Sequence, residues 1–367
     1  MRQHVFLCVA AVLLIGAALF GAGCVQPPDT AAGPQNYQWT LTEVSRITHS
    51  PSGDAASLLP APEQFAIAAE SHLFSGTADG RQIAGMIFDD NQSLFQTDLS
   101  SENTRRLLTG SFIGNESRIV DISYQKKDHT ISAIHLATAN AAVLQYPDLT
   151  GTWNCTSARQ IGISGEEPLQ GTSLTILNQT GPLFSGVADI DIAGTITPHT
   201  FVGGIYTAPE STASGIIIME DGEFWDMELT GGVLSFWTVG VSESASGAEI
   251  VSAIREYGRG SDPVTTPGLL GTWSADAEQT ISAAGLRETS NDPQTILVNK
   301  TSGNLFAGPA FGGKVDQNGV IVFGTRLDDD VYLYRGWVEK DIIHAARLYT
   351  EDGVKYAAAA VYLRTTA

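Results

Sequence analysis

Leu149-Thr150-Gly151-Thr152-Trp153 recurs as Leu269-Leu270-Gly271-Thr272-Trp273, and this repeated stretch decides the fold. About thirty residues after each tryptophan the chain carries a second shared marker, Leu183-Phe184-Ser185-Gly186 in one case and Leu305-Phe306-Ala307-Gly308 in the other. Two markers in the same order and at nearly the same spacing indicate two copies of one structural unit.

A third, more diverged copy lies upstream, where Leu73-Phe74-Ser75-Gly76 is the second marker and Trp39 stands in place of the other tryptophans. The copies also end alike, in Ser132-Ala133-Ile134-His135-Leu136, Ser252-Ala253-Ile254-Arg255 and Ala359-Ala360-Val361-Tyr362-Leu363. The sequence therefore predicts units over residues 37–146, 147–262 and 263–367. A linker rich in Gly and Pro, from Gly258 to Gly268, separates the last two, so the units are expected to share few contacts.

Within each copy the pattern is that of short strands joined by tight turns. Residues 224–229 and 233–237 flank Gly231-Gly232, which predicts a hairpin, and Asn318-Gly319 is a second strong hairpin turn. About 100 residues of consecutive hairpins leave no room for crossover helices. The predicted fold is therefore all-β, with three tandem antiparallel meanders that each close into a barrel and so remove their exposed edges.

The opening Leu-x-Gly-Thr-Trp strand, followed by Gly-rich hairpins, is similar to the start of avidin and lipocalin barrels, the calycin group. The chain also resembles uncharacterised archaeal and other prokaryotic surface lipoproteins that carry such units in tandem. The resemblance implies that Trp153 and Trp273 plug the closed ends of their barrels and are structural. The residues with which avidin holds biotin have no match here, and no cofactor is predicted.

The N-terminus has the layout of a secretory signal over residues 1–23. Met1-Arg2-Gln3-His4 is followed by an apolar stretch from Val5 to Phe20 and then by Gly21-Ala22-Gly23-Cys24. An uncleaved membrane anchor is the alternative, but about 16 apolar residues fall short of the roughly 20 that span a bilayer. The ending resembles the lipobox of prokaryotic lipoproteins, although Gly21 replaces the usual Leu. This resemblance implies a lipid on Cys24, residues 24–36 as a flexible tether, and a place on the outer face of the cytoplasmic membrane.

Net charge and cysteine content exclude some classes of function and structure. The chain has 40 acidic and 20 basic residues, a formal charge of −20, which would repel a phosphate backbone and excludes nucleic acid as a partner. Once Cys8 is removed with the signal and Cys24 carries lipid, only Cys155 remains, so no intramolecular disulfide is expected. Cys155 lies in a predicted strand and is interpreted as structural.

The sequence carries few patterns typical of catalytic or metal-binding sites. No two of the seven histidines have the spacing of a metal site, and His135 and His344 are interpreted as barrel residues. Two carboxylate pairs, Asp189 with Asp191 and Asp226 with Glu228, each lie on one face of a strand. An acidic face of this kind is expected on the solvated outside of a barrel. No catalytic or metal-ligating residue is therefore predicted.

Five asparagines have a Ser or Thr two positions later with no Pro between, which makes them candidate N-glycosylation sites in an exported chain. They are Asn91, Asn115, Asn154, Asn178 and Asn299.

The sequence thus predicts a lipid-anchored extracellular protein with a binding or structural role. Its partners would be the membrane, through the anchor, and a small molecule, a glycan or another envelope protein. The alternatives are an envelope component with filled barrels and a secreted hydrolase acting on envelope or extracellular glycans. A cavity open at one end of a barrel would distinguish binding from a filled scaffold.

Overall fold

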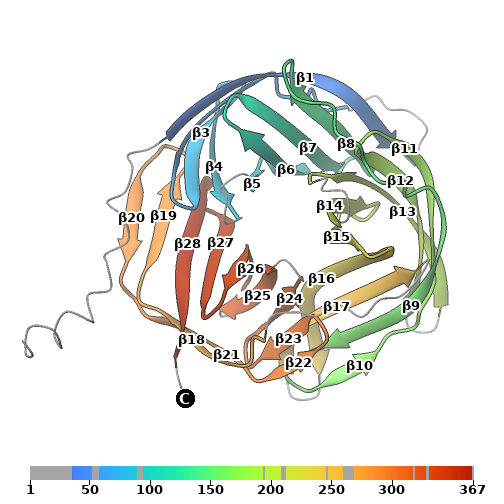
Figure 1. Cartoon of the computed structure of the whole chain (residues 1–367), viewed down its shortest axis with the longest axis vertical. Coiled ribbons are helices and arrows are strands. Elements are labelled where there is room, and N and C mark those ends of the chain that lie inside the picture. Colours follow the sequence, from blue (N-terminus) through green and yellow to red (C-terminus); the bar gives the residue numbers. More distant parts are fainter. Residues whose placement is uncertain are drawn as a thin grey trace, which may run out of the picture. The chain divides into compact units, whose positions relative to one another are not determined.

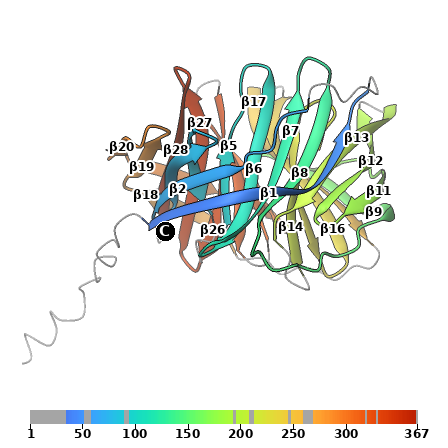
Figure 2. The same ribbon diagram turned by 90° about the horizontal axis from the view of Figure 1, so that it is seen from above.

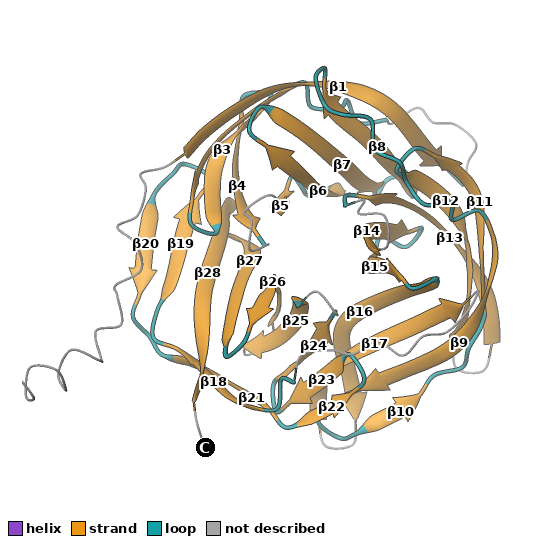
Figure 3. Ribbon diagram, viewed as in Figure 1, coloured by secondary structure: helices purple, strands orange, loops and turns teal. Residues whose placement is uncertain are grey.

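The computed structural model describes residues 35–51, 58–88, 94–192, 195–207, 212–244, 247–258, 268–316, 319–327 and 330–365. Every regular element among these residues is a β-strand, and the strands form three antiparallel sheets in chain order (Figures 1 and 3). Within this part of the chain, no helical segment reaches the length and apolarity of a membrane span. The prediction of an all-β, antiparallel fold is confirmed.

The first sheet is a closed eight-stranded barrel. Its strands are β1 (Gln35–His49), β2 (Gln64–Glu70), β3 (Leu73–Ala78), β4 (Arg81–Ile87), β5 (Leu94–Asp98), β6 (Thr104–Ile113), β7 (Glu116–Gln125) and β8 (Thr130–Thr138). The 15-residue β1 closes the barrel by pairing with β8 from Leu41 to His49, with an irregular register between Glu43 and Ser45. Figure 2 shows the length of this strand.

The second sheet also closes, because its first long strand pairs with its last. Its strands are β9 (Gly151–Ile161), β10 (Glu166–Pro168), β11 (Ser173–Thr180), β12 (Leu183–Ile192), β13 (Thr195–Ile205), β14 (Thr212–Met219), β15 (Phe224–Thr230), β16 (Val233–Ser244) and β17 (Gly247–Gly258). β9 pairs with both β11 and β17, while the short β10 lies on β9 outside the eight-stranded ring.

The third sheet has eleven strands and is not shown to be a closed barrel. They are β18 (Gly271–Ala275), β19 (Glu278–Ser282), β20 (Arg287–Ser290), β21 (Gln294–Val298), β22 (Lys300–Ser302), β23 (Leu305–Gly308), β24 (Phe311–Val315), β25 (Val320–Leu327), β26 (Asp330–Glu339), β27 (Ile342–Glu351) and β28 (Val354–Thr365). β18 pairs with β28 and β21, and the meander from β28 runs back to β22. The prediction of three barrels is thus confirmed for two units.

The Gly-Gly hairpin predicted from the sequence is present. β15 and β16 pair from Asp226 with Trp237 to Thr230 with Val233. Gly231 and Gly232 both have positive φ, +58° and +80°. A two-residue turn of this kind needs positive φ at both positions, which explains the glycine pair. β24 and β25 also form the second predicted hairpin, although Asn318 itself lies outside the described residues.

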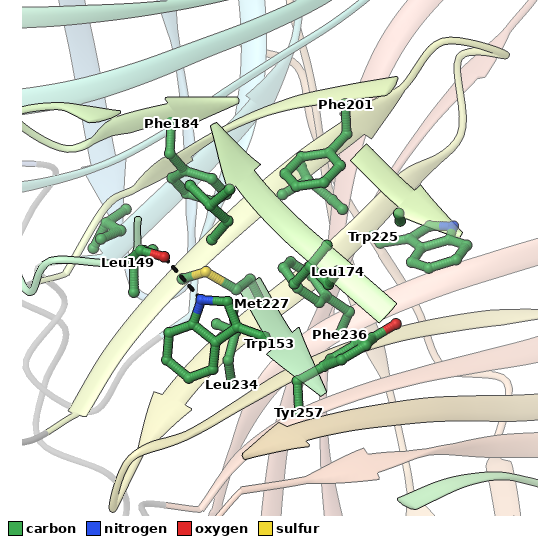
Figure 4. Close-up of a cluster of buried hydrophobic side chains, with 14 of the residues drawn as sticks. Leu149, Trp153, Leu174, Phe184, Phe201, Trp225, Met227, Leu234, Phe236 and Tyr257 are labelled. Carbon is green, nitrogen blue, oxygen red and sulfur yellow. Dashed lines mark hydrogen bonds between the residues drawn. The ribbon is translucent and has the colours of Figure 1, made fainter. Parts of the chain in front are cut away.

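Large side chains fill the interiors of the two closed barrels. The first contains Trp39, Phe65, Phe74, Phe95 and Phe112, whose rings contact one another. Figure 4 shows the second core, in which the labelled aromatic residues are Trp153, Phe184, Phe201, Trp225, Phe236 and Tyr257. Dense packing of this kind is what an eight-stranded barrel without a ligand requires.

The sheets share three buried clusters, so the expectation of few contacts between units was wrong. The first and second sheets bury Ile122 and Ile131 against Val202 and Ile218, among others. The first and third bury Leu73, Ala84 and Met86 against Ile281, Ala346, Ala357 and Ala359. The second and third bury Ile161, Trp237 and Ile254 against Leu305, Ala307 and Val322. Outward apolar residues that would be exposed on a free barrel find partners on the neighbouring sheet.

Candidate functional site

The third unit is opened on one side because one of its hairpins is short. In the second barrel, β12 and β13 span ten and eleven residues, and β12 pairs with β11 as far as Leu174 with Ala188. The equivalent β23 and β24 span four and five residues. At Gly308 the end of β23 still lies close to β21, since an added Cβ at Gly308 would lie 1.8 Å from the Leu297 carbonyl oxygen. The chain turns back directly after this residue, and the start of β21 has no described strand partner on that side.

A cavity of about 460 Å³ lies at this opening. Residues 293–297 border it on one side and residues 309–311 on the other, and Tyr334 and Tyr362 extend into it from the core of the unit. The volume is in the range of small-molecule sites. The cavity thus reaches the core of the third unit, whereas the cores of the two closed barrels are filled by their own side chains.

Arg347 is the central polar group of the cavity wall. On β27 it follows Ile343 and Ala345, which belong to the core, so the alternation of the strand turns its side chain inward. Its Nη2 donates to Glu278 Oε1 at 2.9 Å, and the two side chains are 13% and 8% exposed. Only one hydrogen bond joins them in the structure, and Arg347 Nε is buried without a hydrogen-bond partner.

Tyrosine rings fix the plane of this guanidinium. The Arg347 Cζ lies 4.5 Å from the ring centre of Tyr332, 4.9 Å from that of Tyr349 and 5.5 Å from that of Tyr334. Contacts of a cation with aromatic faces at these distances are attractive, the more so when partly buried. The ring faces are thus used by the protein's own cation, which holds Arg347 in place at the cavity.

The phenols of Tyr334 and Tyr362 remain protonated. Burial raises the pKa of Tyr334 to about 12, and it also raises the pKa of Tyr362. The Tyr362 hydroxyl donates to Gln294 Oε1 at 2.6 Å. The polar groups facing the cavity are consequently neutral donors and acceptors together with the guanidinium groups of Arg326 and Arg347. Among the described residues that line the cavity there is no carboxylate, and Glu278 behind them is paired with Arg347.

The two tryptophans singled out from the sequence are buried, 2% exposed for Trp153 and 0% for Trp273. Their indole N–H groups donate to the equivalent carbonyls of Leu149, at 2.8 Å (Figure 4), and Leu269, at 2.9 Å. Each tryptophan thus ties its first strand to the segment just before it. Trp39 is buried as well, and its indole donates to the Gly114 carbonyl at 3.3 Å.

The modification sites predicted from the sequence are spread over the surface or lie outside the described residues. Four of the asparagines are exposed, namely Asn115, Asn154, Asn178 and Asn299. Asn91 lies outside the described residues, as do Cys24 and the whole signal segment. None of the four exposed asparagines lines the cavity.

The expectation that Asp226 and Glu228 face solvent was wrong. Both are 5% exposed, because the outer face of β15 is covered by the third sheet. Arg335 Nη2 lies 2.6 Å from Asp226 Oδ1, and Lys314 Nζ is paired with Glu228 and lies 3.3 Å from the ring centre of Trp237. Burial raises the pKa of Asp226, with Arg335 opposing the shift. These carboxylates neutralise cations of a neighbouring sheet.

For the other pair, the structure describes the side chain of Asp189 alone. Asp189 is partly buried, and its carboxylate accepts a hydrogen bond from the Ser173 hydroxyl at 2.6 Å, while the side chain of Asp191 lies outside the described residues. Cys155 lies on β9, and burial raises the pKa of its thiol, which disfavours the reactive thiolate.

His135 and His344 lie on β8 and β27 as expected. The fold also brings together two histidines that are far apart in sequence. His72, in the turn between β2 and β3, has its ring centre 5.2 Å from that of His344, and both contact the Trp337 ring. Burial, and secondarily His344, lowers the pKa of His72 to about 4. Among the described residues, no group of three His, Cys, Asp or Glu side chains could hold a metal ion.

Sequence reasoning missed the cavity and Arg347. One signal was available: Arg347 and Tyr349 continue the inward alternation of Ile343 and Ala345, so a charged residue occupies a position facing the core. The shortened hairpin at Pro309-Ala310 was a second signal, visible when the two copies are compared.

No protein-family model matches the sequence, and no curated protein matches it. Among solved structures, the chain is similar to isotype 1 transferrin binding protein B from serogroup B Neisseria meningitidis. That match has 8% identity, covers 92% of this chain and 77% of the other, and has a TM-score of 0.19. Intact Ap-TbpB with its N and C lobes matches at 10% identity, 91% and 77% coverage, and a TM-score of 0.18. A double mutant of transferrin binding protein B from Haemophilus parasuis Hp5 matches at 10% identity. This match covers 91% of this chain and 77% of the other, and it has a TM-score of 0.17. At these TM-scores the likeness carries no inference about this chain.

Proposed function

We propose that the protein is an exported, lipid-anchored binding protein that holds a small molecule in the cavity of its third unit. The cavity at the short β23–β24 hairpin is the observation that carries this proposal. The two closed barrels, filled by their own side chains, then serve as the support that holds the third unit.

A non-catalytic role fits the chemistry of the site better than hydrolysis does. Acid–base hydrolysis of a glycan needs two carboxyl groups that face one cleft. The cavity wall offers guanidinium groups and neutral phenols instead. Asp226 and Glu228 are buried against Arg335 and Lys314, so neither is available to a substrate.

The test is a thermal-shift screen of the whole protein against small molecules and a low-molecular-weight extract of the producing cells. A ligand at 100 times its Kd stabilises the native state by about 2.7 kcal/mol, which gives a measurable rise in Tm. Ala310→Trp is the blocking variant, since Ala310 is an exposed residue that lines the cavity. Val143→Trp is the matched control, because Val143 is 91% exposed and does not line the cavity.

We expect at least one compound to raise the Tm of the wild type and of Val143→Trp while leaving that of Ala310→Trp unchanged. An equal rise in both variants would place binding elsewhere on the molecule. A screen with no rise for any compound would favour the structural alternative, an envelope component without a ligand.

A further inference from the structure

Each unit has two outer flanks that contact its neighbours. The marker flank is the outer face of the hairpin with the Leu-Phe marker, which is β3–β4, β12–β13 or β23–β24. The closing flank is the outer face of the last hairpin, which is β7–β8, β16–β17 or β27–β28. Each of the three buried clusters between units, here called seams, joins a closing flank to a marker flank.

The seams follow one another in a closed cycle. The closing flank of the first unit packs on the marker flank of the second, and that of the second packs on the third. The third unit completes the cycle, because Ala357 and Ala359 of its closing flank cover Leu73 and Met86 of the first unit. Contacts between unlike faces of like units produce a closed assembly when the rotation from unit to unit closes.

The three marker hairpins have the same register and use the same positions in their seams. The equivalent pairs are Leu73 with Met86, Leu183 with Gly204 and Leu305 with Lys314. Met86 packs on the third unit. A Cβ added at Gly204 would lie 2.5 Å from Val120 of the first unit, and Lys314 Nζ lies over the Trp237 ring of the second. Each position therefore faces the preceding unit in the cycle.

A second set of equivalent residues lies beside the closing hairpins. The residue eight positions after the repeated tryptophan is an isoleucine in every copy, namely Ile47, Ile161 and Ile281. Ile161 and Ile281 are 2% and 1% exposed within their seams, and Ile47 is partly buried against the seam of the first and second units.

A third set brings the units together at one place. Two positions after Met86, Gly204 and Lys314 come Phe88, Tyr206 and Asp316, which are 1%, 9% and 4% exposed. The rings of Phe88 and Tyr206 are 6.1 Å apart. Burial raises the pKa of Tyr206, Arg335 opposes this shift, and the Asp316 carboxylate adds to it. Equivalent residues of three units thus lie near one another.

The side chains of the seams differ, although their arrangement is the same. Gly204 leaves room for Val120, whereas Lys314 is paired with Glu228 and Met86 packs against alanines. A marker flank therefore matches one closing flank in size and charge, and a mismatched flank would bring a clash or an unpaired buried charge.

From this pattern we infer that the two flanks of each unit are complementary binding surfaces for another unit of the same kind, and that the chain is a closed cycle of three such units. The third unit then binds the first in the way that the first binds the second.

The first test moves the covalent connection from one seam to another. Residues 139–150 connect β8 to β9 and residues 259–270 connect β17 to β18, twelve residues in each case, but no such connection spans the seam of the third and first units. A permuted chain starts at Leu144, runs to Thr365, continues through a Gly/Ser linker and ends with residues 35–143. A linker of about 20 residues reaches about 66 Å when extended, further than the natural connections can.

We expect the permuted protein to keep the hydrodynamic radius and the urea midpoint of the natural order, because the same three seams form. An expanded or unfolded permuted protein would overturn the equivalence of the seams.

The second test keeps the natural order and removes a connection only after folding. A specific protease site inserted after Val143, which is 91% exposed, allows the folded chain to be cut. The first unit is then held by its two seams alone. Ala359→Arg places a charge in the seam of the third and first units. Val361→Arg is the matched control, since Val361 lies two positions later on the same face of β28 and is 41% exposed.

We expect the two fragments of the cut protein to stay together in size-exclusion chromatography. Two contacts that act together bind about 10²–10⁴ times more tightly than one alone. Ala359→Arg should therefore raise the Kd of the fragments, measured by dilution of the labelled complex, by at least about 100-fold. Val361→Arg should leave it unchanged.

Fragments that separate as soon as the chain is cut would overturn the inference. An equal Kd for Ala359→Arg and Val361→Arg would show that the third unit does not bind the first, and would overturn the closed cycle. Neither result affects the proposed ligand site, which the thermal-shift screen decides separately.

Discussion

Trp273 lies in the core of the third unit. It is fully buried, its indole donates to the Leu269 carbonyl, and the Arg364 guanidinium lies 4.5 Å from its ring centre. Truncating a buried tryptophan to Ala removes a large apolar contact area and leaves a cavity, at a cost of about 3–5 kcal/mol. We therefore expect Trp273→Ala to lower the free energy of unfolding by this amount in denaturant titrations.

The control for this substitution is Leu270→Ala, three positions away and 54% exposed, which should change stability by no more than about 0.5 kcal/mol. A Trp273→Ala protein as stable as the Leu270→Ala protein would show that the indole does not hold the core. It would favour a ligand-stacking role for the repeated tryptophan instead.

We propose that Cys24 determines where the protein resides. Its place after Gly21-Ala22-Gly23 resembles a lipobox, and lipid on that residue would anchor the chain to the membrane. We expect Cys24→Ser to move the protein from the membrane fraction to the medium, as measured by fractionation and immunoblot. Cys155→Ser, which leaves the proposed anchor intact, is the control and should stay with the membrane. Retention of Cys24→Ser in the membrane would argue for the apolar stretch itself as the anchor.

At the scale of elements, the contact of β15 with β24 depends on a buried ion pair. Glu228 and Lys314 have side chains 6% and 1% exposed. Removing one partner leaves the other charge buried and uncompensated, which typically destabilises a protein by about 3–5 kcal/mol. We expect Glu228→Gln to do so, and the double variant Glu228→Gln with Lys314→Met to recover most of the loss.

Glu43→Gln is the matched control, because it breaks the pair with Arg46 in which the Glu43 side chain is 37% exposed. Such surface pairs contribute about 0–1 kcal/mol. The three free energies of unfolding come from urea titrations. A double variant less stable than Glu228→Gln alone would mean that Lys314 contributes through something other than this pair, such as its contact with Trp237.

The strands and turns of this fold could be predicted because their signals are local. Gly231-Gly232 needs only its own backbone angles to specify a turn, and the alternation within a strand is visible in a few residues. The environment of Glu228 could not be predicted from local signals. Its partner Lys314 is 86 positions away, on a strand of another sheet. The side chain does point out of its own barrel, but the neighbouring sheet buries it. Arg347 was missed for a related reason: its cavity exists because β23 is short, and that length matters only once the sheet is assembled.

At the scale of the whole molecule, His72 and His344 join the first barrel to the third sheet. Their pKa values are lowered by burial, that of His72 to about 4 from an ordinary value near 6.5. Below about pH 6.5 the unfolded chain takes up protons that the native protein does not. The contribution of His72 to the stability of this junction is therefore complete above pH 6.5 and is lost as the pH falls toward 4, by about 1.4 kcal/mol per pH unit.

We expect His72→Gln to reduce this slope between pH 6.5 and 4, measured as the free energy of unfolding at several pH values. His49→Gln is the control for the loss of a histidine elsewhere in the same barrel. All three proteins contain the same carboxylates, so the contribution of these groups cancels when the slopes of unfolding free energy against pH are compared. Equal slopes in the wild type and His72→Gln would show that His72 is already solvated in the native protein.

The cluster shared by the first barrel and the third sheet has a consequence for the order of events during synthesis. Leu73, Ala84 and Met86 belong to the first unit, but Ala346, Ala357 and Ala359, which cover them, are made only after the whole second unit has been translated. The Asp98 carbonyl likewise gains its hydrogen bond only after Lys355 has been made, because Lys355 Nζ donates to it at 2.7 Å and lies 257 positions later in the sequence. A nascent chain can therefore close its first barrel long before it can cover that barrel's apolar flank. For the time needed to translate two further units, this flank is a surface that chaperones must protect or that neighbouring chains can bind.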